Sequence, residues 1–444
     1  MNIKKIRECK TLEEFFQVIP EQIFQKLALL LMIYWSISPI IVAVTSWITG
    51  ENLGIELSSI VYEIGNLGLI IGFFLAIKSL TSSREKNIKL FIKENKHNLL
   101  LTLMLLGSFI SALNAKNSCF AFYGDNYRRE GFFRYISYAG FYICALNLGN
   151  EKYKKIVFYT LSTVGTILAF LTILQFYEVN VSAFSMNMKY ASIFHNTNHF
   201  GYYLSIIALV AAVLSIVEEK KYLSLIFLAE FAIMLTALII NNTFGSYLGV
   251  LGGIIFIIGI FFMSRGKIIK EGFIPLIIFI VISLFMNSGY VNGSGNGNVC
   301  ENFSSLKNDA ESIVTGSKDS GKAGSSRWIL WVNALDFIKE KPLIGYGPDN
   351  LSKEYNSVDI NQSRPHNEYI QHAACLGIFS LLCYMGAICI IGLNIFNKRK
   401  TLKLSTIISI CAVASYLISA LFGNTMYYTT PYFFIVLGIA SKVD

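Results

Sequence analysis

Long apolar runs recur along the whole chain and are separated by polar connections. Runs of about 17–25 residues are long enough to cross a ~30 Å hydrocarbon layer as helices. Because backbone polar groups in lipid must be satisfied within the segment, the runs predict helices rather than open strands. The pattern predicts twelve spans, at 27–47, 58–77, 99–115, 132–149, 156–177, 199–216, 222–241, 244–263, 272–288, 374–396, 404–422 and a short one at 429–441. We therefore predict an all-α polytopic membrane protein.

The composition excludes an ordinary soluble domain. The chain is 54% hydrophobic and 15% charged, whereas soluble domains have about 25% charged residues. The first twenty residues are charged and polar, and no small-residue cleavage site follows the first apolar run, so we expect no cleavable signal peptide.

Basic residues predict the orientation in the membrane. The N-terminus, the even-numbered connections and the C-terminus hold most of the 37 Lys and Arg, with dense runs at 78–96 and 397–400. Cytoplasmic loops carry such an excess, so both termini are predicted to be cytoplasmic in a multi-pass protein of the cell membrane. The net charge of +9 records this topology and does not indicate a nucleic-acid partner.

One long polar segment divides the chain. Residues 1–288 contain the first nine predicted spans, residues 289–373 form an extracytoplasmic loop, and residues 374–444 contain the last three spans. A chain this apolar is expected to keep such a hydrophilic loop for work at the membrane surface. The candidate chemistry therefore lies there.

The first half of this loop predicts a linker and then a helix. Residues 292–298, rich in Gly, Asn and Ser, are typical of a flexible linker. Ser325 and Ser326 can cap a helix in which Trp328 and Trp331 recur at helical spacing, and Pro342 ends it. The aromatic face is expected at the membrane interface. Arg327 would then lie in the first turn.

A second helix is predicted to begin near His366 and to continue into the tenth span. Ser363 is a possible cap, and Pro365 is tolerated in a first turn. The helix dipole disfavours imidazolium at this end and attracts anions such as phosphate. A neutral His beside Arg327 and Arg364 suits attack by a hydroxyl with a phosphorylated leaving group. The alternative is an interfacial cluster that contacts lipid head groups.

Cysteine spacing does not indicate a disulfide framework or a metal site. Of the eight cysteines, only Cys119 and Cys300 lie in predicted outward connections, where an oxidising compartment could join them. Their pairing is left open. We expect no metal and no cofactor.

Other polar residues near or inside the spans have structural alternatives. Glu63 and Glu230 lie within spans, where an ionisable group is costly, and we favour bonded structural roles for both. Arg134 could reach the outward face by snorkelling, with a phosphate-binding role as the less favoured interpretation. His195 and His199 are expected to cap and pack rather than to catalyse.

Several motifs resemble a known family. The signature block of the O-antigen ligase and polymerase superfamily is similar in order and spacing to Arg327-x-x-x-Trp331, to Pro-Leu-Ile-Gly-Tyr-Gly-Pro at 342–348, to His-Asn-Glu-Tyr at 366–369 and to Leu-Gly-Ile at 376–378. Weaker likenesses are the Gly-Arg-Gly-like segment at 122–131 and the Asn-rich helix entry at 194–201.

The resemblance implies a metal-independent, inverting glycosyltransferase. Such an enzyme moves a glycan from undecaprenyl diphosphate to an acceptor hydroxyl on a glycan, lipid or protein, in surface polysaccharide biosynthesis. The family's catalytic residues map onto Arg327 and His366, where His366 either accepts the acceptor proton or positions the diphosphate. Its earlier outward arginine maps onto Arg128. Asn367 and Glu368 are supporting residues.

The chain departs from the ligase pattern at one position. Phe244 stands where a ligase arginine would align, so another cation must replace it at the diphosphate. Arg128, Arg129 and Arg364 are the candidates. A repeat-unit polymerase of the same superfamily is the alternative to a ligase. A transporter or flippase is a further alternative, although we see no repeated halves typical of transporters.

Overall fold

The computed structural model describes residues 7–51, 53–82, 95–179, 190–265, 270–288, 299–315, 321 and 323–442, and the regular structure within them is helical. The helices are α2 (Leu12–Val18), α3 (Glu21–Thr49), η1 (Gly54–Glu56), α4 (Leu57–Ser82), α6 (Lys96–Leu113), α7 (Ser118–Tyr123), α8 (Phe132–Leu146), α9 (Glu151–Phe176), α10 (Thr197–Val217), α11 (Lys221–Asn241), α12 (Phe244–Arg265), η3 (Lys270–Phe273), α13 (Ile274–Met286), α14 (Val299–Thr315), α15 (Ala323–Glu340), α16 (Ser352–Asn356), α17 (Glu368–Leu376), α18 (Ile378–Asn397), α19 (Leu404–Ser419) and α20 (Thr430–Ser441).

Each predicted span falls on a helix, so the all-α prediction is confirmed for the described residues. Eight helices are long and apolar enough to cross a membrane: α3, α4, α6, α9, α10, α11, α12 and α18. The other predicted spans coincide with the shorter helices α8, α13, α19 and α20. The twelve crossings therefore stay a prediction.

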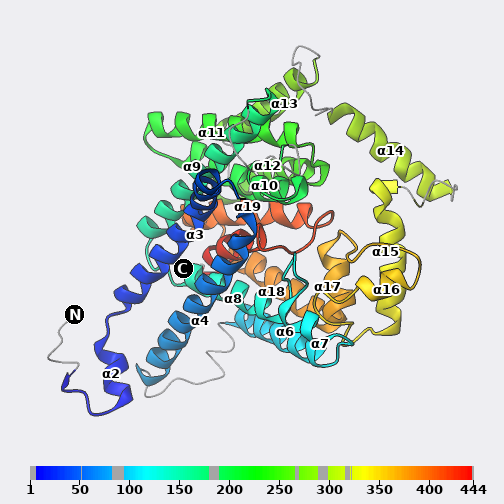
Figure 1. The fold of residues 1–444 in the computed structure, drawn as a ribbon. Coiled ribbons are helices and arrows are strands. Elements are labelled where there is room, and N and C mark those ends of the chain that lie inside the picture. Colours follow the sequence, from blue (N-terminus) through cyan, green and yellow to red (C-terminus); the bar gives the residue numbers. More distant parts are fainter. Residues whose placement is uncertain are drawn as a thin grey trace.

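Helices α10 and α20 form the centre of the bundle (Figure 1). Helix α10 packs against α9, α11, α12 and α19, while α20 packs against α8 and α19. A helix that is apolar on all sides is stable only when it is surrounded. The apolar residues of α3, α4, α13 and α18 are instead partly exposed, including Trp47 at 66% and Leu284 at 66%. An outer surface this apolar suits contact with lipid.

Small residues allow α4 and α8 to approach closely. A Cβ on Gly65 would lie 2.5 Å from the Cα of Ser137, and one on Gly140 would lie 1.9 Å from the carbonyl oxygen of Gly65. Small-residue interfaces of this kind are typical of helix pairs in membranes, where packing replaces the hydrophobic drive.

The connections between spans gather at two ends of the bundle according to their order. In the odd-numbered set, the Asp125 amide donates to Asp349 Oδ2 at 2.9 Å, and Asn241 Nδ2 donates to the Thr197 carbonyl at 3.0 Å. In the even-numbered set, Ser405 Oγ donates to Glu151 at 2.9 Å. This alternation is what successive membrane crossings require.

The predicted orientation can be tested with two exposed polar positions, Ser357 before α17 and Thr401 between α18 and α19. In a background with Cys9, Cys119 and Cys300 changed to serine, Ser357→Cys should react with an impermeant thiol reagent in intact cells. Thr401→Cys should react only after permeabilisation, because basic residues hold its connection in the cytoplasm. Labelling of the Thr401→Cys variant alone in intact cells would reverse the orientation.

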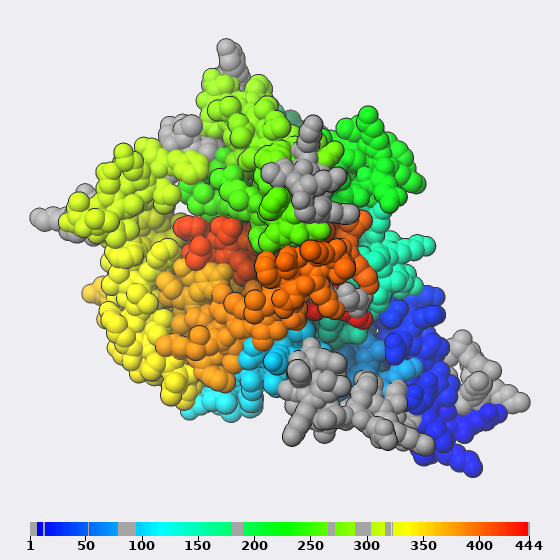
Figure 2. Space-filling model, turned by 180° about the vertical axis from the view of Figure 1, so that it is seen from behind, coloured from blue at the N-terminus to red at the C-terminus, as the bar shows by residue number. Residues whose placement is uncertain are grey.

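The long loop contains more helix than predicted. Its linker at 292–298 lies outside the described residues, and α14 was not predicted. Helices α14, α15 and α16 lie together at one flank, and α15 contacts both α14 and α17 (Figure 1). From behind, the yellow surface of α15 adjoins the orange surface of the α17–α18 region (Figure 2).

Candidate active site

Arg327 begins the regular part of α15. Gly324, Ser325 and Ser326 have left-handed backbones with φ of 61°, 57° and 66°, so the helical conformation starts at Arg327, in the first turn as predicted. The serines do not adopt the extended conformation of an N-cap, which corrects that part of the prediction. The Gly324 amide instead donates to Asp309 Oδ2 at 2.9 Å.

The guanidinium of Arg327 is mostly available. Its one hydrogen bond among the described residues is from Nη1 to the Gly324 carbonyl at 3.3 Å, and the side chain is half-buried. An arginine carries five N–H donors in a planar fork that matches phosphate oxygens. The remaining donors of Arg327 can therefore bind an anion.

His366 lies just before α17 rather than inside it. Asn367 is the N-cap, and its Oδ1 accepts from the amides of Tyr369 and Ile370 at 3.1 Å. Ser363 is thus not the cap, because the helix begins later than predicted. Trp331 Nε1 donates to the Pro365 carbonyl at 2.8 Å, which joins α15 to the His366 segment.

Burial and neighbouring charge keep His366 neutral. Burial lowers the pKa of His366 to about 4, helped by the positive charges of Arg327, Arg364 and Arg128. The predicted neutral state agrees with this, but burial is the first cause, whereas we had expected the helix dipole. Three of the predicted cations thus contribute positive charge at this imidazole.

Asn424 contacts the imidazole directly. Its Nδ2 lies 3.1 Å from His366 Nδ1, in the connection between α19 and α20. If the amide donates, Nδ1 is the acceptor and the proton lies on Nε2. If the amide is rotated by 180°, Nδ1–H donates to Oδ1, which is otherwise buried without a partner among the described residues, and Nε2 is free to accept a proton.

Arg364 is committed to an internal ion pair. Its Nη2 lies 2.7 Å from Asp349 Oδ1, and its Nη1 donates to the Thr425 carbonyl at 2.9 Å. Both partners of the ion pair are almost completely buried. Arg364 therefore joins two parts of the long loop to the connection between α19 and α20, and it is poorly placed to offer all of its donors to a ligand.

Asp349→Asn is expected to lower stability strongly. The change would leave the Arg364 charge buried and without its counterion, which typically costs ~3–5 kcal/mol. The melting temperature of the purified protein in detergent should fall. Asp336→Asn, which removes the exposed partner of Lys339, is the matched control and should change it little. An unchanged melting temperature for D349N would contradict this role of the pair.

Arg128 keeps a more open position. Its Nη1 lies 2.9 Å from Asp125 Oδ2, and its side chain is 28% exposed. Among the described residues, Asp125 is the one acceptor of the Arg128 guanidinium, so its other N–H donors can bind an anion. Asp125 in turn donates its amide to Asp349, the counterion of Arg364. The two arginines are thus held in one network.

Arg129, unlike Arg128, makes a backbone contact and, among the described residues, no side-chain ion pair. Its carbonyl accepts from Arg134 Nε at 3.1 Å, and its charge is absent from the causes that lower the His366 pKa. The loop that carries it is closed by two glycines: a Cβ on Gly124 would lie 2.2 Å from the Glu130 nitrogen, and one on Gly131 would lie 2.4 Å from the Phe122 carbonyl carbon. This explains the glycines of the upstream segment.

Left-handed backbone at non-glycine residues is frequent in these connections. Examples are Arg129, Ser325, Ser326, Asp349 and His366, with φ between 52° and 66°. Such conformations cost free energy and persist where the surrounding structure fixes them, which is common at functional sites.

Glu368 is buried and links three helices through hydrogen bonds. Its two carboxylate oxygens accept from Tyr384 at 2.9 Å and Tyr416 at 2.6 Å, and its amide donates to the Ala420 carbonyl at 2.9 Å. These bonds fix the start of α17 against α18 and α19. The residue thus supports the site through position, as does the cap formed by Asn367.

The glycines of the signature block allow the turn after α15 to lie close to the end of α17. The amides of Tyr346 and Gly347 donate to the carbonyls of Ala374 and Cys375 at 3.0 and 2.9 Å. A Cβ on Gly377, whose φ is 85°, would lie 2.0 Å from the Leu343 carbonyl oxygen. Gly377 also separates α17 from α18, so the helix predicted to run continuously into the tenth span is interrupted.

Arg134 does not reach the surface as predicted. It is fully buried, and its Nη1 donates to the Ser58 carbonyl at 2.7 Å. Glu130, which sequence reasoning did not single out, is also fully buried and accepts from Tyr138 at 2.6 Å. Burial raises the pKa of Glu130 to about 7, against the opposing effect of Arg364.

The remaining predicted residues have packing contacts. The ring of His195 lies 5.0 Å from that of Tyr127, and the ring of His199 lies 5.6 Å from that of Tyr428. Asn196 caps α10.

Two further predictions concern acidic residues and thiols. Glu230 accepts from Ser162 and from Thr163, which supports its structural role, whereas Glu63 is exposed on α4. Cys119 has a free thiol, and the Cys300 side chain lies outside the described part.

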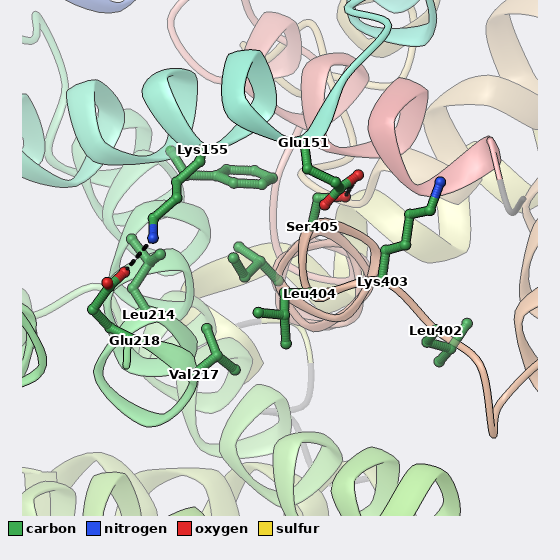
Figure 3. Close-up of a pocket in the computed structure, with 11 residues that line it drawn as sticks. Glu151, Lys155, Leu214, Val217, Glu218, Leu402, Lys403, Leu404 and Ser405 are labelled. Atoms are coloured by element: carbon green, nitrogen blue, oxygen red, sulfur yellow. Dashed lines mark hydrogen bonds and ion pairs between the residues drawn. The ribbon is translucent and has the colours of Figure 1, made fainter. Parts of the chain in front are cut away.

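A cavity of about 340 Å³ lies at the opposite end of the bundle (Figure 3). Lys155 points toward Glu218 and pairs with it at 2.8 Å, while Glu151 lies beside Ser405. This cavity is formed by the even-numbered connections and lacks the arginine–histidine arrangement described above.

The fold and the site define a polytopic helical membrane protein with a cationic, histidine-containing site at one end of the bundle. Residues 229–385 match the family model described as O-antigen ligase. The chain thus carries a domain of the O-antigen ligase family, which confirms the resemblance predicted from its motifs. No curated protein sequence matches the chain. The match supports, at family level, an O-antigen ligase- or polymerase-like membrane glycosyltransferase, a class that acts on lipid-linked glycans.

Proposed function

We propose that this protein transfers a glycan from undecaprenyl diphosphate to an acceptor hydroxyl at the outer face of the cell membrane. The observation that carries the proposal is that Trp331 joins the helix of Arg327 to the segment of His366, and that Arg327 and Arg128, each with unused donors, both lower the pKa of His366 by their charge. The matched family segment contains both Arg327 and His366.

In the proposed reaction the acceptor oxygen attacks the anomeric carbon, and the bond from that carbon to the diphosphate oxygen breaks. The diphosphate leaves with the electron pair, and the acceptor proton is released. Attack from the face opposite the leaving group inverts the anomeric configuration. Donors aimed at the leaving oxygens stabilise the charge that develops there. Arg327 and Arg128 supply these donors, while Arg364 positions the loops through Asp349.

His366 has two proposed roles that correspond to the two orientations of the Asn424 amide. With Nε2 unprotonated it accepts the acceptor proton, and with Nε2 protonated it donates to the diphosphate. Binding of an anionic diphosphate offsets the arginine charges that lower the His366 pKa. The imidazole therefore becomes a stronger base in the complex than in the free protein.

Reconstituted vesicles test the proposal. The purified protein should transfer the glycan from a lipid-linked donor to an acceptor on the same side of the membrane, without net movement of donor across the bilayer. Donor translocation without transfer would instead indicate a transporter or flippase.

Deletion in the host separates ligase from polymerase. A gel profile of surface polysaccharide that collapses to single repeats would indicate a polymerase, whereas long chains left on the lipid carrier would indicate a ligase. Phe244 at the position of a ligase arginine makes this comparison necessary.

A further inference from the structure

A second feature of the site end is a cavity of about 640 Å³ between α14, α15 and the turn that joins α11 to α12. Its volume falls within the ~300–1,000 Å³ of small-molecule sites. The residues that matter for its chemistry are Asn198, Phe244, Asp309, Arg327, Trp328 and Trp331. We call it the α14–α15 cavity.

The inner wall of the α14–α15 cavity is preorganised. Asn241 Nδ2 donates to the carbonyls of Tyr190 and Thr197 at 2.9 and 3.0 Å, and Thr243 Oγ1 donates to Asn241 Oδ1 at 2.6 Å. These bonds fix the turn at the start of α12. A Cβ on Gly245 would lie 2.6 Å from the Phe422 side chain, so glycine is needed for this wall to close.

The cavity adjoins the proposed catalytic site and shares Arg327 with it. Arg327 lines it, and the charge of Arg327 acts on His366. Trp331 also lines it and donates to the carbonyl of Pro365, the residue before His366. A group bonded to a diphosphate on Arg327 would thus lie close to the cavity.

The lining combines flat apolar faces with polar groups that retain hydrogen-bonding capacity. Trp328, Trp331 and Phe244 supply the faces. Asp309 Oδ2 is used by the Gly324 amide, but its other oxygen and the side-chain amide of Asn198 have no hydrogen-bond partner among the described residues. A sugar ring presents C–H groups on its faces and hydroxyls around its edge, and both parts of this lining complement it. A prenyl chain would leave the polar groups unpaired, which costs free energy.

We propose that the α14–α15 cavity is a carbohydrate subsite that holds a sugar ring beside the diphosphate. The sugar belongs either to the lipid-linked glycan or to the acceptor. This inference rests on the proposed function for its place in the reaction, but sugar binding can be measured without transfer.

Trp328 is the best position for a test. It lines the cavity, and it makes no hydrogen bond to another described residue, unlike Trp331. Trp328→Leu removes the aromatic face and retains an apolar side chain. Trp47→Leu, on the exposed surface of α3, is the matched control. Asn198→Ala is a second variant that removes a polar contact without changing the aromatic wall.

The binding probe is the oligosaccharide repeat released by mild acid from the surface polysaccharide of the cells that carry the protein. Tryptophan fluorescence of the full-length protein should respond to this probe, because two of its four Trp line the cavity. W328L and N198A should bind the probe at least about tenfold more weakly than wild type, the loss expected when an anchor in a pocket is removed. W47L should bind the probe like wild type. Undecaprenyl diphosphate without sugar should bind W328L and wild type equally.

Transfer kinetics identify the source of the sugar. A higher KM for the lipid-linked donor in W328L, at fixed acceptor, indicates the donor glycan, and a higher KM for the acceptor indicates the acceptor glycan. Equal probe binding by W328L, N198A and W47L would overturn the subsite, as would the absence of any wild-type response. If wild type binds the probe but transfers nothing, the proposed function fails and the subsite stands.

Discussion

His366→Ala is expected to abolish glycan transfer while the protein remains folded and inserted. Acid–base assistance alone typically contributes ~10²–10⁴ in rate, so the loss should be visible in an endpoint assay with reconstituted protein. His366 is half-buried, and among the described residues its side chain makes one hydrogen bond, to Asn424. The melting temperature should therefore change little. Full activity of H366A at normal protein level would remove His366 from the site.

His366→Gln separates the two roles of this residue. Glutamine can donate a hydrogen bond to phosphate but cannot accept a proton near neutral pH. Substantial activity in H366Q would exclude general base catalysis and would favour positioning of the diphosphate. Activity as low as that of H366A would favour the base.

The pH dependence provides an independent check of the same role. A base must be unprotonated, and the pKa of His366 is lowered to about 4 in the free protein. If His366 is the base, kcat/KM, which reports the free protein, should stay flat through pH 6.5 and fall only as the pH approaches 4. In the complex the diphosphate offsets the arginine charges and raises this pKa, so kcat should fall at a higher pH than kcat/KM. Coincident acid limbs would contradict the proposed contact between diphosphate, arginines and imidazole.

Arg327→Lys is expected to reduce transfer about 10²–10³-fold, the effect of removing one preorganised donor from a developing anion. Lysine keeps the charge but loses the planar fork that binds two phosphate oxygens together. The measurement is kcat/KM for the lipid-linked donor in vesicles. Lys339→Ala is the matched control, because Lys339 lies on the same helix, is 76% exposed and pairs only with Asp336 among the described residues.

Substitution of Arg128 should also reduce glycan transfer. Arg128→Ala removes the second available cation, and its effect together with R327K should differ from the sum of the separate effects, since both arginines contact one ligand in the proposal. Normal transfer by both Arg327→Ala and Arg128→Ala would exclude a diphosphate site between them.

The sequence by itself determined the helical architecture. Lipid leaves the backbone no partner outside its own helix, so apolar runs such as those that became α10 and α18 have one available structure. It also marked Arg327 and His366 as candidate site residues, because the spacing of their motifs is a local feature. The end of α15 before Pro342 is local for the same reason, since proline has no amide to continue a helix.

The tertiary structure alone decided which polar residues cooperate. Asp349 binds Arg364, and Asn424 contacts His366 across a long stretch of sequence, and neither pairing follows from local spacing. The structure likewise buried Arg134 against Ser58 and left Arg327 with donors unused. The free energy of each charge depends on the groups that surround it in three dimensions, and helices distant in the chain supply those groups. The pattern of apolar residues predicts at which end of the bundle a connection lies, but not which side chains pair there, and therefore not which cations are free to bind a ligand.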